Sequence, residues 1–274
     1  MPRIAGPKDF KVAVLGAGRI GSSLVRSFVK CGLQVTATGR REETLKRAET
    51  LGALATRDNK AAIAASEIVI ISVKPSQLPQ LLKEVRGHLN GKIVVSIVAG
   101  VRRSTLEKAL GAAHVYRAMP NVNASIGLSS TAVSGPQDGE AAGVVESILL
   151  CAGKVYWVPE DLLDAWTVVS GSMPAFAALI VDSLVLGGVS AGLPRELAMS
   201  AVLDSLRGTV EMLERGVHPM VLRDEVVTPA GVTIAGLKVM EYMGVPAALI
   251  KAVDEAVRRA RELGSIVDSA MREG

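Results

Sequence analysis

Aromatic residues and cysteines are scarce in this chain of 274 residues, which contains three Phe, three Tyr, two Trp and two Cys. The hydrophobic share is nevertheless 49%, so the core must be aliphatic, and the length suffices for one large domain or two ordinary ones. Cys31 and Cys151 lie far apart in apolar surroundings, and the three histidines add no metal-ligand spacing. We therefore expect no bound metal and no disulfide scaffold.

Runs of basic residues and an apolar leader are absent as well. The net charge of +4 comes from scattered Lys and Arg, which predicts no nucleic-acid partner. Residues 1–10 are typical of a short tail rather than of a signal peptide. Residues 173–193 have the length and apolar character of a membrane span but include Asp182 and three glycines. We expect this segment to be a helix in a subunit interface, and the protein to be cytoplasmic with no membrane partner.

Short Val- and Ile-rich runs alternate with amphipathic segments between Lys11 and Trp157. This alternation predicts parallel strands and a doubly wound sheet of Rossmann type. The predicted strands are KVAVLG, QVTAT, ALA at 53–55, EIVIISV, KIVVSIV and HVYRAM, with a later pair around LSSTAVSG and GKVYWV.

The strand pattern stops after Pro159, and helices are predicted at 161–190, 194–215, 231–243 and 246–272, with breaks at SGSMP, AGLP, GVHP and MGVP. The fold class is therefore α/β: a dinucleotide-binding Rossmann domain in 1–160, followed by an all-helical domain in 161–274 for substrate binding and dimerisation. The helices at 173–193 and 197–210 carry more apolar surface than they can cover on one another, which indicates a homodimer.

The segment VAVLGAGRIGSSLV places Gly16, Gly18 and Gly21 directly after a strand and at the start of a helix. In this context the three glycines predict a dinucleotide site: the first allows the tight turn, the second lets the pyrophosphate approach, and the third lets the helix pack on the sheet. Arg19 and Ile20 open the helix whose N-terminus would face the pyrophosphate.

The second strand ends in TATGRREE, where an NAD-binding protein usually has an acid for the ribose 2′-hydroxyl. Thr38 and Gly39 stand in place of that acid, and Arg40 and Arg41 follow. Two guanidinium groups suit a 2′-phosphate, so we predict NADPH as the cofactor, with NADH as the second candidate. The alternative is that both arginines open a solvent-exposed helix and are partly neutralised by the acids that follow.

Several segments together resemble the pyrroline-5-carboxylate reductase family. EIVIISVKPSQ is similar to the family's strand that ends in Val-Lys-Pro, and RAMPN is similar to its Arg-x-Met-Pro-Asn turn. HPMVLRDEVVTPAGVTIAGLKVME is similar to its most specific region, a His-Pro pair followed by Thr-Pro-x-Gly-x-Thr and a helix. The resemblance extends from about residue 11 to 270. It implies NAD(P)H-dependent reduction of L-1-pyrroline-5-carboxylate to L-proline, the last step of proline biosynthesis.

The resemblance also implies that the substrate, a cyclic imine with a carboxylate, is held in position rather than activated by a strong acid or base. Thr228 and Thr233 are the expected hydroxyl donors, at the N-terminus of a helix that favours a carboxylate. The alternative is a plain Thr-Pro helix cap. The full set of expected substrate-binding residues is Thr228, Ala230, Gly231, Val232, Thr233, Met119 and Asn121.

Further cofactor-binding residues follow from the resemblance alone. One is Asn59, near the adenosine ribose. The loop after the fourth strand contributes Ser72, Val73, Lys74 and Pro75, and the position after the fifth strand contributes Ala99. The rival interpretation of Lys74 is a proton donor to the imine.

The chain departs from the family pattern at three positions. Met173 and Ala230 replace glycines, and Gly39 replaces an asparagine. Met173 leaves open a larger cyclic imine acid as the substrate. A different alternative is a catalytically inactive NADP-binding regulatory protein. A 3-hydroxyacid dehydrogenase is disfavoured because residues 173–193 contain no lysine to act as its base. The family also implies assembly into homodimers and rings of dimers.

Overall fold

The computed structural model describes residues 10–272, so nearly all of the predicted N-terminal tail lies outside the described residues. The chain divides into two compact units. The first comprises residues up to Pro174 together with those from Ala256 onward, and the second comprises Ala175–Glu255. Two long helices, α8 (Met173–Ser190) and α12 (Val245–Arg272), each contribute residues to both units.

An eight-stranded sheet with the order β3-β2-β1-β4-β5-β6-β7-β8 forms the centre of the first unit. Strands β1 to β6 are mutually parallel, which confirms the predicted doubly wound Rossmann sheet. The strand order reverses between β1 and β4, the position at which such sheets bind dinucleotides. The strands are β1 (Lys11–Leu15), β2 (Gln34–Thr38), β3 (Leu54–Thr56), β4 (Ile68–Ile71), β5 (Ile93–Ser96), β6 (His114–Met119), β7 (Ser129–Ser134) and β8 (Gly153–Trp157).

The last two strands depart from the predicted parallel arrangement. β7 is antiparallel to β6, with Arg117 opposite Ser134, and β8 is parallel to β7. The chain between β6 and β7 covers only residues 120–128, whereas a parallel crossover needs about a dozen residues or more. This short link, which contains the 3-10 turn Val122–Ile126, therefore reverses the chain direction.

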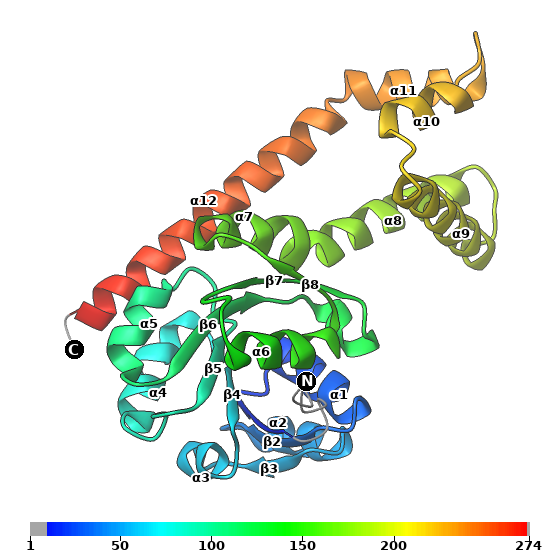
Figure 1. Ribbon diagram of the computed structural model, residues 1–274. Helices are drawn as coiled ribbons and strands as arrows, with labels where there is room; N and C mark the ends of the chain where they lie inside the picture. The colour runs from blue at the N-terminus through cyan, green and yellow to red at the C-terminus, as the bar shows by residue number, and fades with distance from the viewer. Residues whose placement is uncertain (1–9, 273–274) are drawn as a thin grey trace. The chain divides into compact units, whose positions relative to one another are not determined.

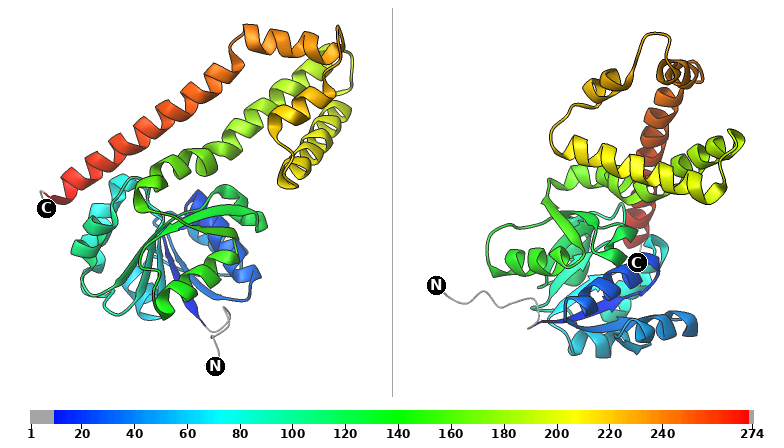
Figure 2. Two further views of the ribbon diagram at one scale, coloured as in Figure 1. Left: turned by 45° about the horizontal axis from the view of Figure 1, so that its top comes forward. Right: turned by 90° about the vertical axis from the view of Figure 1, so that its right-hand side faces the viewer.

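Helices cover both faces of this sheet (Figures 1 and 2). Alternate strand residues point to opposite faces, so Val12 and Val14 join one apolar cluster while Ala13 and Leu15 join the other. Residues of α1 (Arg19–Lys30), α2 (Glu42–Thr50) and α6 (Glu140–Leu150) belong to the first cluster. Residues of α3 (Asn59–Ala64), α4 (Leu78–Val85) and α5 (Arg103–Leu110) belong to the second.

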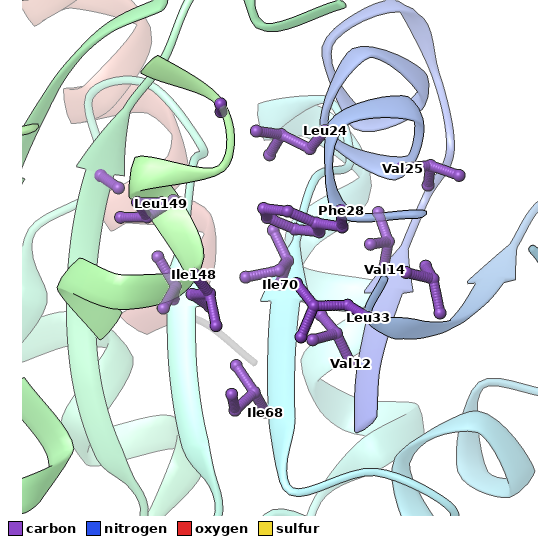
Figure 3. Close-up of a cluster of buried hydrophobic side chains, with 14 of the residues drawn as sticks. Val12, Val14, Leu24, Val25, Phe28, Leu33, Ile68, Ile70, Ile148 and Leu149 are labelled. Carbon is purple, nitrogen blue, oxygen red and sulfur yellow. The ribbon is translucent and has the colours of Figure 1, made fainter. Parts of the chain in front are cut away.

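The first cluster shows how this aliphatic core is filled. Phe28 of α1 and Ile148 of α6 lie on either side of Ile70, which projects from β4 (Figure 3). Phe28 and Ile70 are fully buried. At roughly 25 cal/mol per Å² of apolar surface removed from water, side chains of this kind supply most of the driving force for folding of the first unit.

A disulfide joins Cys31 and Cys151, whose Cα atoms are 5.9 Å apart, so our expectation of no disulfide was wrong. Cys31 ends α1 and Cys151 ends α6, and both pack against the first cluster. The two helices lie on the same face of the sheet, which brings their C-terminal ends together across a sequence separation of 120. Spacing in the sequence carries no sign of this proximity.

The second unit consists of helices: most of α8, then α9 (Arg195–Glu214), α10 (Pro219–Val226), α11 (Val232–Tyr242) and the first part of α12. Our prediction missed α10 because we interpreted its His-Pro pair as a break. Pro219 instead occupies the first helical position, which tolerates proline, and His218 Nδ1 accepts the N–H of Met220 as a cap.

Few side chains of the second unit are buried within a single chain. Val185 of α8 and Ala198 of α9 are its fully buried apolar residues, in a segment that the structure describes completely. The helical stretch Glu160–Ser190 is long and apolar enough to cross a membrane, and only 11% of its apolar window is buried. Length and composition alone do not separate a membrane span from a helix that is covered by another subunit.

Candidate functional site

The turn between β1 and α1 has the geometry that its three glycines predict. Gly16 has a φ of +90°, and a Cβ there would lie 2.8 Å from Val73 Cγ1. A Cβ on Gly21 would lie 2.6 Å from the Gly16 carbonyl oxygen, so α1 packs tightly against the turn. At Gly18 a Cβ would meet no protein atom within 4 Å. The turn therefore leaves open space at the position where a pyrophosphate would approach the backbone.

A cavity of about 400 Å³ opens at this turn, at the carboxyl ends of the strands. Of the predicted cofactor-binding residues, it is lined by Gly16, Gly18, Gly39, Arg40, Arg41, Asn59, Ser72, Val73 and Lys74. The remaining predicted residues, Arg19, Ile20, Gly21, Pro75 and Ala99, do not line it. The lining also includes residues that our prediction missed: Ala17, Thr38, Thr44, Arg57, Gln77 and Leu81.

Thr38 occupies the position of the acid that NAD-binding proteins usually have, and its hydroxyl is used within the protein. Thr38 Oγ1 accepts the N–H of Gly16 (3.1 Å) and donates to Asn59 Oδ1 (2.6 Å). Asn59 Nδ2 in turn donates to Glu84 Oε1 of α4 (2.9 Å). This chain of hydrogen bonds holds the glycine turn, the end of β2 and the start of α3 together around the cavity.

The cavity lining is strongly cationic. Arg40, Arg41, Arg57 and Lys74 all contribute to it, and among its lining residues, which all lie in the described part of the chain, none is acidic. Such a lining favours a ligand with several negative charges. A dinucleotide that carries a 2′-phosphate has more of them than one that carries a 2′-hydroxyl.

Two of these arginines are held by neighbouring groups. Arg40 Nη2 donates to Gln80 Oε1 of α4 (2.9 Å). Arg57, the first residue after β3, donates from Nη1 to the Arg40 carbonyl oxygen (2.5 Å) and from Nη2 to Glu42 Oε2 (2.7 Å). The one sequence signal for Arg57 is the predicted strand at 53–55, because the carboxyl ends of parallel strands meet at one edge of a sheet, but the sequence does not say which strand it pairs with.

The Met-Pro-Asn turn after β6 is buried. Met119 is 6% exposed and belongs to a small apolar cluster that also includes Ala99. Asn121 is 4% exposed and its side chain is engaged at both ends: Oδ1 accepts the N–H of Asn123 (3.0 Å), and Nδ2 donates to the carbonyl oxygen of Ser170 (3.1 Å). The roles of Met119 and Asn121 in substrate binding therefore stay predictions, and any such role for Asn121 is positional.

The partner of Asn121 has a physical explanation in the next helix. Ser170 lies in a π-helical segment, Thr167–Ser172, directly before α8. An α-helix would bond the Ser170 carbonyl to the N–H four residues later, but that residue is Pro174, which has no N–H. Asn121 supplies the missing donor. Segments of π-helix often accompany functional sites, and this one ends directly before Met173, where the chain departs from the family pattern.

The predicted substrate loop lies in the second unit, between α10 and α11. The N–H of Gly231 donates to the Thr228 carbonyl oxygen (3.0 Å), which closes a four-residue turn with Pro229 and Ala230 in its centre. Ala230 has a φ of +56° and is the one non-glycine residue with positive φ among the described residues. This turn position favours glycine, so a strained alanine lies within the predicted site.

The loop leads into the N-terminus of α11 without a side-chain cap. Gly231 is the N-cap residue and makes no side-chain hydrogen bond to the first N–H groups of the helix. A Cβ on Gly231 would clash with the Thr228 hydroxyl, so that hydroxyl lies beside the start of the helix. Thr233 is half-buried in the first turn. The arrangement offers free N–H groups, two hydroxyls and the positive end of a helix dipole to an anion.

Two family models match the chain. The model described as pyrroline-5-carboxylate reductase dimerisation matches residues 160–263, and the model described as NADP oxidoreductase, coenzyme F420-dependent, matches residues 11–100. The first match contains the exposed helices of the second unit, and the second contains the glycine turn and the arginines of the cavity.

Similar proteins cover nearly the whole chain. A pyrroline-5-carboxylate reductase of Thermus thermophilus is 37% identical, over 93% of this chain and 98% of that protein. One from Synechocystis is 40% identical over 76% of this chain and 79% of that protein. The crystal structure of a Plasmodium falciparum pyrroline carboxylate reductase with NADP bound has a TM-score of 0.86 and 25% identity, covering 94% of this chain and 99% of that one.

Proposed function

This chain belongs to the pyrroline-5-carboxylate reductase family, and from this membership we propose that it reduces L-1-pyrroline-5-carboxylate to L-proline with NADPH as the preferred reductant. The reaction class rests on the family. The observation that carries the choice of NADPH over NADH is the cavity at the glycine turn, which four cationic side chains and no acidic ones line among its described residues.

The residues of the cavity fit a dinucleotide with a 2′-phosphate. Gly18 leaves room for the pyrophosphate at the positive end of α1, and Arg40 and Arg41 follow the strand that would border the adenosine ribose. NADPH, when bound, supplies the hydride that adds to the imine carbon. Thr38 cannot take the part of the missing acid, because its hydroxyl already bonds Gly16 and Asn59.

The start of α11 would hold the substrate carboxylate. Free N–H groups and the helix dipole favour an anion by roughly 0.3–1 kcal/mol, and by up to about 2 kcal/mol where the site is partly buried. Each hydroxyl hydrogen bond to a charged group adds about 1.5–3 kcal/mol. Thr228 and Thr233 are the two hydroxyl donors at this point. A plain helix cap is less consistent with the loop, because no side chain caps α11.

The chain needs no dedicated strong acid for this reaction. A cyclic imine of this kind carries a proton on nitrogen in a substantial fraction of molecules at neutral pH, so reduction needs the hydride and correct placement. The segment from Val226 to Leu237 contains no side chain that works as an acid or base near neutral pH. Lys74 lines the cofactor cavity, so in this scheme it serves to position the cofactor rather than to protonate the imine.

Oligomerisation is part of the function, because the match to the dimerisation family covers the helices whose apolar surface a single chain leaves exposed. We propose a homodimer as the basic unit, with assembly of dimers into rings as the extension that the family resemblance implies. The apolar stretch Glu160–Ser190 then serves subunit contact rather than a membrane, in a cytoplasmic enzyme.

Oxidation of NADPH and NADH, followed by absorbance with racemic pyrroline-5-carboxylate, tests the proposal. We expect rapid turnover and a higher kcat/KM with NADPH. The six-membered imine acid runs in parallel, because Met173, 42% exposed at the start of α8, favours a changed pocket as the second candidate. Turnover of the larger ring alone would replace the substrate, and NADPH binding without any turnover would indicate the regulatory protein.

A further inference from the structure

We infer that Arg57 is a third arginine of the subsite that selects a 2′-phosphate. In the absence of that phosphate, the Glu42 carboxylate holds the Arg57 guanidinium group in place, and a bound phosphate displaces the carboxylate. The inference rests on the proposed preference for NADPH and goes beyond it, because neither residue belongs to the pattern that predicts the cofactor. It concerns the replacement of a carboxylate by a phosphate as the partner of the Arg57 guanidinium group.

The sheet places Arg57 beside the two predicted arginines. Thr56 pairs with Thr38 in the parallel register of β2 and β3, so Arg57 follows one strand where Gly39 and Arg40 follow the other. Arg57 lines the cavity, and Glu42 does not. The guanidinium group therefore joins the cavity to a carboxylate outside it.

Two hydrogen bonds orient the Arg57 side chain. Nη1 donates to the Arg40 carbonyl oxygen (2.5 Å), and Nη2 donates to Glu42 Oε2 (2.7 Å). The first bond ties Arg57 to the backbone of the loop that carries the other arginines. Nη2 can change partner more readily than Nη1, because its acceptor is an exposed side chain rather than a backbone group.

The ion pair with Glu42 is too exposed to be explained by stability. The two side chains are 58% and 63% exposed, and pairs of this kind typically contribute about 0–1 kcal/mol. A phosphate carries a higher negative charge than a carboxylate and accepts bidentate hydrogen bonds from the planar guanidinium group. Exchange of the Glu42 carboxylate for a phosphate therefore costs little free energy and gives Arg57 a stronger hydrogen-bond partner.

The exchange predicts opposite effects at the two residues. Removal of Arg57 weakens binding of a 2′-phosphate, whereas removal of the Glu42 charge strengthens it, because a competing partner is lost. Glu43 provides the matched control: it is also exposed in the first turn of α2, and no ion pair of Glu43 occurs within the described residues. A general change of local charge would make Glu42→Gln and Glu43→Gln equal.

Calorimetric titration with adenosine 2′,5′-bisphosphate and with 5′-AMP tests this without turnover. For Arg57→Gln we expect about tenfold weaker binding of the bisphosphate, as for loss of one partly exposed charge-assisted bond, and unchanged binding of 5′-AMP. Glu42→Gln should bind the bisphosphate severalfold more tightly than the wild type does, and Glu43→Gln should bind it as tightly as the wild type. In Arg57→Gln/Glu42→Gln the gain from Glu42→Gln should vanish. Unchanged 5′-AMP binding also shows that each variant is folded.

The failures are distinguishable. If the wild type binds both ligands equally, the proposed NADPH preference itself is wrong. If the wild type prefers the bisphosphate but Arg57→Gln keeps that preference, Arg57 is no part of the subsite and the inference is overturned. If Glu42→Gln and Glu43→Gln have the same effect, or if the gain persists without Arg57, the exchange at Glu42 is overturned.

Discussion

The two units of this chain differ in how far a single copy can bury its apolar side chains. In the first unit two clusters fill both faces of the sheet, and strand residues such as Val14 and Ile70 are fully buried. In the second, Val185 and Ala198 are the fully buried apolar residues of a completely described segment. The first unit contains its own core, whereas the second requires another surface to cover it.

The same contrast separates the cofactor cavity from the proposed substrate loop. Residues of the first unit form the cavity for the dinucleotide. The hydrogen bonds around this cavity join strands and helices that pack on the buried core of the same unit. The substrate loop belongs to the exposed helical unit, where Val232 is 90% exposed. We therefore expect cofactor binding to depend on the fold of one chain, and substrate turnover to depend also on the assembly of chains.

A charge on the exposed helical surface should have the largest effect. Leu184 of α8 is 47% exposed in one chain, and Leu184→Glu would place a carboxylate in the proposed subunit interface. An unpaired buried charge costs several kcal/mol. We therefore expect the Kd for subunit association to rise more than about a hundredfold, and the activity to be lost. Light scattering after size-exclusion chromatography measures the mass of the assembly.

Leu54→Glu is the matched control, because Leu54 is 75% exposed on β3 of the first unit. That variant should keep the mass and the activity of the wild type. If Leu184→Glu also kept both, the helical unit would not need a partner at α8, and the contrast between the units would have another cause.

Substitution in the substrate loop should have a smaller effect that is confined to the reaction. Thr233→Val keeps the shape of the side chain but removes its hydroxyl, and loss of one hydrogen bond to a carboxylate of about 1.5–3 kcal/mol lowers kcat/KM roughly 10- to 150-fold. The Kd for NADPH should not change, because Thr233 does not line the cofactor cavity. Steady-state kinetics and fluorescence titration with NADPH separate the two.

Thr233→Ser retains the hydroxyl and should recover most of the activity. Equal kcat/KM values for Thr233→Val and the wild type would remove Thr233 from the site. A parallel loss of NADPH binding would show that the loop and the cavity are not separate, which would break the contrast between the units.

Local patterns were sufficient to predict most elements of both units. The short buried apolar strands, such as β1, and the glycine turn after β1 follow from residues that are neighbours in the sequence. The misses have local reasons too. His218 and Pro219 were interpreted as a break although both are signals of a helix start. The short link before β7 already excluded a parallel crossover.

Contacts between distant residues were beyond the sequence. Asn121 meets Ser170 because Pro174 leaves a carbonyl without its usual donor, and only the folded turn shows that the amide is within reach. Arg57 enters the cavity through the register of a three-residue strand, β3, which has no motif of its own. The partner of Cys31 lies 120 residues away.

The disulfide should affect stability alone, and only in the unit that is already well packed. It joins the C-terminal ends of α1 and α6, and neither Cys31 nor Cys151 lines the cofactor cavity. A crosslink that closes a loop of this length restricts the unfolded chain, with typical contributions of about 2–4 kcal/mol and up to about 5 kcal/mol in the chain-entropy model. We expect Cys31→Ser/Cys151→Ser to lower the Tm while it leaves the Kd for NADPH and the mass of the assembly unchanged.

Thermal unfolding with and without a thiol reductant tests this expectation. The reductant should lower the Tm of the wild type toward that of the double variant and should not affect the variant, since the variant has no cysteine to reduce. Thiol titration of the denatured wild type should detect no free thiol before reduction. Two free thiols in the unreduced protein would contradict the disulfide, and the first unit would then owe its stability to the buried clusters on the two faces of its sheet.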